Sequence, residues 1–208
     1  MPKNILKPGK KYTFSDYFYL SNPPEEIVKE LGYLLTIEKL NFPSSKEPNK
    51  DQELIDNLRS TYYLLIPKVS LNSEIAKREL IIAPLLHGVI RKIDVRLNIE
   101  YTIEIDDRLS GTIDYLLRSQ QQLIVIEAKK GDLEKGFTQL AIEMIALDQY
   151  EDDDFPHIIY GVITIGEVWR FAILNRQEKT IIKDIHTFRF PEDLEEIFSR
   201  IKGILSSE

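Results

Sequence analysis

Apolar residues recur at helical spacing directly after Ser73. Steps of three and four residues connect Ile75, Glu79, Ile82, Leu86 and Val89/Ile90. Such a stripe is typical of an amphipathic helix, and Asn72 or Ser73 can cap its start. Glu79 interrupts the stripe, so it is a polar residue on an otherwise apolar face.

The period then changes from helical spacing to strict alternation. Residues 99–106 alternate apolar or aromatic side chains with charged or polar ones, which predicts a half-exposed strand. The runs 111–117 and 122–129 predict two more strands. We expect the three strands to form an antiparallel meander, the last two joined by a two-residue turn at Gln120–Gln121.

The remainder of the chain predicts further helices and strands. A helix is expected from Asp132 through Leu147, strands at 158–165, 168–174 and 180–185, and a closing helix at 191–205. Before Ser73 we expect a helix at 24–31, a strand at 33–40 and a helix at 51–65, with loops at 21–24 and 41–49. The pattern indicates an α/β (α+β) fold with a mixed β-sheet flanked by helices. Residues 1–70 are expected to be an N-terminal extension packed on a core domain of residues 71–208.

The amino-acid composition excludes several classes of functional site. The 208 residues include no cysteine and three histidines, and the formal charge is −7. Thiolate zinc sites, disulfides and cysteine nucleophiles are thereby excluded, and wholesale polyanion binding is disfavoured. The longest apolar run, Leu80 to Leu86, is far shorter than a membrane span of roughly 18 residues. We therefore expect a cytoplasmic protein that does not associate with membranes.

Three charged residues carry the candidate chemistry. Glu127 and Lys129 share one face of their strand, and the two-residue turn would place Asp114 directly opposite Glu127. Two facing carboxylates repel each other, so such a pair needs a shared proton or a bound cation. Mg²⁺ fits best, because it takes one or two carboxylates plus water and substrate phosphate. The arrangement predicts metal-assisted phosphodiester hydrolysis, with Lys129 orienting or deprotonating the attacking water.

Asp114, twelve intervening residues and then Glu127-Ala128-Lys129, set between two helices, resemble the PD-(D/E)XK nuclease superfamily over residues 73–165. The resemblance implies a restriction-endonuclease-like three-layer core and a Mg²⁺- or Mn²⁺-dependent nuclease acting on DNA, for example an endonuclease. It implies that Asp114, Glu127 and the carbonyl of Ala128 bind the metal and that Lys129 serves the water. A glutamate of the first helix would complete the site, with Glu79 preferred and Glu74 in reserve. Gln139 resembles a glutamine on the second helix of several branches, and Ile113 stands where many members have proline.

Other readings of the same residues remain open. The three charges could form a solvated salt bridge on a structural scaffold, or the chain could be a catalytically silent module that binds nucleic acid or a partner. A homodimer is the default expectation for a soluble assembly. Any DNA contact must use local basic groups, of which the candidates are Lys3, Lys7, Lys10, Lys11, Lys77, Arg78, Arg91, Lys92, Arg96, Lys129, Lys130 and Lys135.

Overall fold

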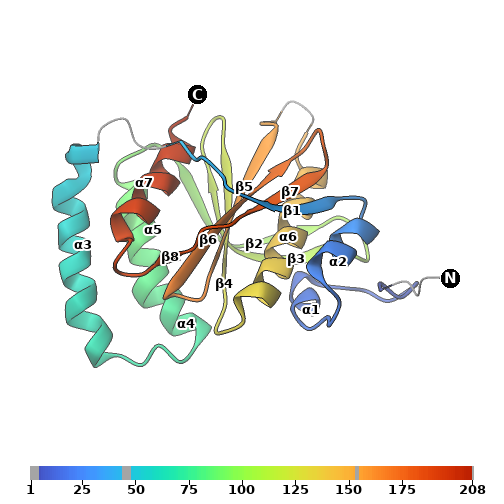
Figure 1. Ribbon diagram of the computed structural model, residues 1–208, viewed down its shortest axis with the longest axis horizontal. Coiled ribbons are helices and arrows are strands. Elements are labelled where there is room, and N and C mark those ends of the chain that lie inside the picture. The colour runs from blue at the N-terminus through green and yellow to red at the C-terminus, as the bar shows by residue number, and fades with distance from the viewer. Residues whose placement is uncertain (1–4, 44–47, 153–154, 208) are drawn as a thin grey trace.

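The computed structural model describes residues 5–43, 48–152 and 155–207, so Lys3 and part of the predicted loop at 41–49 lie outside the described residues. It is a mixed α/β fold built around an open sheet (Figure 1). The predicted fold class, a mixed sheet flanked by helices, is confirmed. No helix in the described part of the chain is long and apolar enough to cross a membrane.

The described strands form one eight-stranded sheet. They are β1 (Leu34–Glu38), β2 (Arg96–Glu104), β3 (Ser110–Arg118), β4 (Leu123–Ala128), β5 (Ile158–Thr164), β6 (Val168–Asn175), β7 (Thr180–Asp184) and β8 (Phe188–Arg189). Their order is β1-β7-β6-β5-β4-β3-β2, and β8 pairs with β6. The predicted antiparallel meander β2–β3–β4 is confirmed, while β4 runs parallel to β5 and β1 parallel to β7.

Helices cover both faces of the sheet (Figure 1). One layer holds α1 (Phe14–Phe18), α2 (Pro24–Glu30) and α6 (Leu133–Tyr150), and the other holds α3 (Gln52–Leu65), α4 (Glu74–Lys77), α5 (Ala83–Ile90) and α7 (Leu194–Leu205). Short 3₁₀ turns η1 (Pro48–Asp51) and η2 (Ile66–Lys68) flank α3. Each layer buries its own apolar cluster against one face of the sheet. The sheet is therefore shielded from water on both sides.

The helix predicted from Ser73 begins there, since the Ser73 hydroxyl accepts a hydrogen bond from the Ala76 N–H at 3.1 Å. A π-helical turn, η3 (Arg78–Ile82), separates α4 from α5. A π turn contains an extra residue, so it rotates the preceding side chains relative to those that follow. Ile75 is consequently 70% exposed and Glu79 is exposed as well. The predicted apolar stripe is wrong at its first two positions and correct from Ile82 onward.

The residues before Ser73 are built into the same fold. β1 forms one edge of the sheet beside β7, and α1 packs against α6 and β3. Helix α1 was not predicted, because five residues are too few for a recognisable period. Its Phe14 and Tyr17 are buried, and a Thr13–Asp16 capping box starts it. The N-terminal third thus contributes one strand to the sheet and three helices to the layers that cover it.

Candidate active site

The hairpin β3–β4 sets the position of the two carboxylates. The Ser119 N–H donates to the Gln122 carbonyl at 2.9 Å, so the predicted two-residue turn at Gln120–Gln121 is confirmed. Tyr115 pairs with Ile126 at the far end of the ladder. One step further in this register, Asp114 comes opposite Glu127.

Backbone pairing between β3 and β4 ends at this level. Beyond the Tyr115–Ile126 pair, the Ala128 N–H donates to the Asp114 carboxylate, to Oδ2 at 2.9 Å. The facing residue on β2, Glu100, has a left-handed φ of +54°. Alternation on β3 also breaks here, because Ile113 belongs to the α6-side cluster and Tyr115 to the opposite one. The Asp114 side chain therefore takes the place of a backbone acceptor where the two strands separate.

Glu127 is a carboxylate inside the core. Its side chain is almost fully buried, on the face of β4 that α6 covers. Oε1 forms an ion pair with the Lys129 Nζ and accepts a hydrogen bond from the Gln139 Nε2 at 2.8 Å. Oε2 is buried and has no hydrogen-bond partner among the described residues. Because a buried unpaired oxygen is costly, this atom marks a place for a proton or a cation.

Helix α6 brings a second buried carboxylate to the same place. The Gln139 Nε2 also donates to the Glu143 Oε1, at 2.9 Å, so one amide bridges two carboxylates. Glu143 is fully buried, and its Oε2 and the Gln139 Oε1 likewise lack partners within the described parts of the chain. The residues lie one helical turn apart on the side of α6 that faces β4. The sequence signal for Gln139 and Glu143 is that the rest of this helix is apolar on more than one face, which favours a role for both polar side chains.

The acids at this site bind protons more tightly than usual. Burial, and then the nearby charge of Asp114, raise the pKa of Glu127 to about 8. Burial and the charge of Glu127 hold the pKa of Glu143 well above its usual value. Burial also raises the pKa of Asp114, although the Ala128 N–H and Arg78 oppose it. Burial lowers the pKa of Lys129, but the charge of Glu127 outweighs this effect and raises it. Lys129 therefore stays protonated and supplies a positive charge beside these acids.

Arg78 is a second cation at the site, which the sequence analysis assigned only to phosphate contacts. Its guanidinium lies 3.1 Å from the Asp114 Oδ1 and 3.3 Å from the Glu100 Oε1. It also lies over the Tyr115 ring, 5.3 Å from the centroid. Arg78 is the first residue of the π turn, so the helix irregularity places it over the strand end. Nothing in its sequence spacing identifies this contact.

The two candidate glutamates of the first helix lie in different environments. The Glu74 Oε1 accepts the Lys130 N–H at 3.3 Å, and its charge raises the pKa of both Asp114 and Lys129. Glu79, the preferred candidate, is exposed on the π turn. The structure therefore brings Glu74 toward Asp114, Glu127, Lys129 and Gln139, and leaves Glu79 outside that group.

The donor set is compatible with a hard divalent cation. Within the described residues, no three or more His, Cys, Asp or Glu side chains form a ready-made metal centre. Mg²⁺ typically uses one or two carboxylates and completes its octahedron with water and substrate phosphate. Asp114 and the unpartnered Oε2 of Glu127 provide such a pair.

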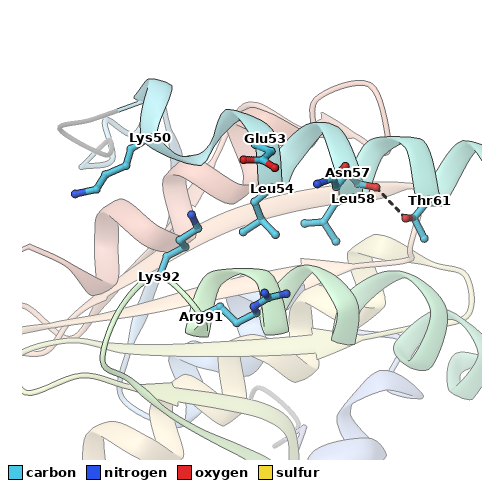
Figure 2. A pocket seen from close by; sticks show the side chains of 8 residues that line it. All are labelled: Lys50, Glu53, Leu54, Asn57, Leu58, Thr61, Arg91 and Lys92. Atoms are coloured by element: carbon cyan, nitrogen blue, oxygen red, sulfur yellow. Dashed lines mark hydrogen bonds between the residues drawn. The ribbon is translucent and has the colours of Figure 1, made fainter.

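A separate cleft of about 510 Å³ lies between α3 and α5 (Figure 2). Leu54 and Leu58 extend from α3 toward α5, and Arg91 and Lys92 approach from the end of α5. Lys92 is paired with the buried Asp51 at 3.3 Å. The cleft is formed by other elements than β3, β4 and α6, and we assign it no chemistry.

Comparison with known proteins adds no independent identification. A scan against family models finds no match, and neither does a search of curated proteins.

Proposed function

We propose that the protein is a Mg²⁺-dependent nuclease of the PD-(D/E)XK type that hydrolyses phosphodiester bonds of DNA. The observation that carries the proposal is the environment of Glu127, a buried carboxylate with one unpartnered oxygen that forms an ion pair with Lys129. Glu127 lies one register step beyond the Tyr115–Ile126 pair, at the level where Asp114 comes opposite it. A structural salt bridge on a solvated strand face would not be buried in this way. The restriction-endonuclease-like fold and the Mn²⁺ alternative are part of the same proposal.

Asp114 and Glu127, with the carbonyl of Ala128, would hold the metal ion. Bound there, Mg²⁺ or Mn²⁺ supplies a water of lowered pKa and positive charge for the phosphate. Glu74 is the third acid that we assign to this site, in place of Glu79, because its carboxylate already contacts the loop after β4. Gln139 holds the Oε1 of Glu127, which leaves the other oxygen available.

Lys129 acts on the reacting groups in this proposal. The water oxygen bonds to phosphorus while the bond from phosphorus to one ester oxygen breaks. One water proton ends on the leaving oxygen, which becomes a hydroxyl, and the other passes to solvent from the new phosphate monoester. Lys129 orients the water and balances the negative charge that develops on the phosphate. It can do so because Glu127 keeps it protonated and close to the strand end.

The Arg78 contact favours a second candidate, a catalytically silent module that binds nucleic acid or a partner. Both oxygens of Asp114 are engaged, one by Arg78 and one by the Ala128 N–H. In the enzyme, the metal ion must either share the Asp114 carboxylate with the guanidinium or displace the guanidinium from it. In the silent module the guanidinium takes the place of the ion.

Incubation with DNA separates the two candidates. Purified protein is mixed with plasmid DNA and with single-stranded DNA, with and without Mg²⁺ or Mn²⁺. The nuclease proposal predicts metal-dependent cleavage that Asp114→Asn and Glu127→Gln abolish, while Glu104→Gln, an exposed acid on β2, leaves it intact. Nucleic-acid binding without cleavage under any metal condition would support the silent module.

A further inference from the structure

The short helix α1 ends at the aromatic residue Phe18, beside the proposed catalytic lysine, and a second aromatic residue, Tyr19, follows it directly. The Lys129 Nζ lies 5.7 Å from the centre of the Phe18 ring. The ring of Tyr19 meets that of Phe18 edge-on, with centroids 5.3 Å apart. Taken together, these separations place the Tyr19 ring within about 11 Å of the lysine nitrogen.

The helix that carries these rings is anchored firmly. Phe14 and Tyr17 are buried, and the Tyr17 hydroxyl donates to the Arg108 carbonyl at 2.8 Å. Gly111 permits this approach, because a Cβ there would lie 2.7 Å from the Phe14 ring. Phe14 and Tyr17 thus anchor the segment in the core, whereas Phe18 and Tyr19 lie outside the core cluster.

Tyr19 is 80% exposed, so its ring is available to a ligand. Burial of a large aromatic side chain normally stabilises a fold, but this one remains in water, directly after an anchored helix. Aromatic rings in such positions stack on nucleic-acid bases, and every base offers a face. In a duplex the base faces are already covered by their neighbours, so only unpaired bases can stack in this way.

We propose that Phe18 and Tyr19 form a stacking platform for unpaired bases, so that the substrate of the site is single-stranded or locally unpaired nucleic acid. The inference rests on the proposed function, because it takes the scissile phosphate to lie at Lys129. Successive nucleotides of a strand are about 3.4 Å apart along a stacked helix. The Tyr19 ring therefore serves a base within about three nucleotides of the cleaved bond.

The test measures binding without cleavage, by fluorescence anisotropy of a labelled oligo-dT in the presence of a metal chelator. Tyr19→Ala should weaken binding at least about fivefold, and Tyr19→Phe should restore it. Tyr63→Ala is the matched control, because Tyr63 is 56% exposed on α3 in the opposite layer and should not affect binding. An abasic strand of equal length and charge should bind wild type and Tyr19→Ala equally, and so should a duplex.

An equal loss on the abasic strand or the duplex, or no loss on oligo-dT, overturns the platform. The same preparations then receive Mg²⁺, which tests the reaction separately. Cleavage combined with unaltered oligo-dT binding by Tyr19→Ala refutes the platform and leaves the nuclease. Tyr19-dependent binding without cleavage refutes the nuclease and leaves base stacking.

Discussion

Replacing Glu127 by glutamine isolates the free energy of placing a carboxylate in this core. The pKa of Glu127 rises from an ordinary value of 4.5 to about 8, chiefly through burial and then through the charge of Asp114. Between these pH values the folded protein keeps a proton that the unfolded chain has released. The free energy of unfolding of the metal-free protein therefore falls as pH rises, by about 1.4 kcal/mol per pH unit for this one group.

The stabilisation that protonated Glu127 gives is fully present below its pKa in the unfolded chain, and it is lost as pH rises through its pKa in the folded protein. Over the whole window the change amounts to about 5 kcal/mol, and between about pH 5.5 and pH 7.5 to about 2–3 kcal/mol. Glu127→Gln cannot ionise, so it should lack this share of the pH dependence. Glu143 cancels only in part, because its raised pKa comes from burial, which both proteins share, and from the charge of Glu127, which the variant lacks.

Urea unfolding with a chelator present, at several pH values across this window, measures the difference. Glu134→Gln is the control: burial raises the pKa of Glu134, but its bonds to Lys183 and Arg170 outweigh burial and lower it. Its substitution should leave the slope between pH 5.5 and 7.5 unchanged. Parallel stability curves for wild type and Glu127→Gln would show that Glu127 is ionised throughout, and the reasoning from burial would fail.

Three further outcomes are expected. Mg²⁺ at a hundredfold excess over its Kd should stabilise the wild type by about 2.7 kcal/mol in thermal unfolding, and an equal shift in Glu127→Gln would place the ion elsewhere. Lys129→Ala should stay folded and bind Mg²⁺ but hydrolyse DNA at least about a hundredfold more slowly, whereas Lys68→Ala, at an exposed lysine of η2, should not; full activity of the first variant would refute the mechanism. Gly136→Ala should destabilise the folded protein by about 1–3 kcal/mol and slow hydrolysis, because the new Cβ would lie 2.9 Å from the Lys129 Cγ. Chemical denaturation measures the loss against Gly131→Ala, whose new Cβ would meet no atom within 4 Å.

Most of the fold could be predicted because its elements are long and regularly patterned. The expected strands and helices match β1 to β7, α2, α3, α6 and α7 to within a few residues. Helix α1 and the two-residue β8 are too short to show a period. The π turn at Arg78–Ile82 was missed for a different reason. Nothing in residue composition marks an extra residue in a helical turn, and that residue moves Glu79 out of the group around Asp114.

The part of the candidate site that lies within the β3–β4 hairpin could be predicted, but the contacts from residues distant in sequence could not. The two-residue turn is a local rule, and its register sets the level at which Asp114 comes opposite Glu127. Alternation on β3 breaks at this level, so that rule alone does not place Asp114. Arg78 and Phe18 reach the site from elements distant in sequence, through a helix irregularity and an unpredicted helix. Such contacts depend on tertiary packing, which a single sequence does not reveal.

Edge strand β1 has a consequence for how the chain matures. Leu34 pairs with Thr180, and β7 is the sheet neighbour of β1. A growing polypeptide has to expose β1 until β7 has left the ribosome, because β7 is its hydrogen-bonding partner and is made much later. Contacts this distant in sequence slow folding, since a long loop must close before they form. During synthesis, the apolar side chains of Leu34 and Ile37, still 58% and 54% exposed in the finished fold, present an unpaired strand to neighbouring chains.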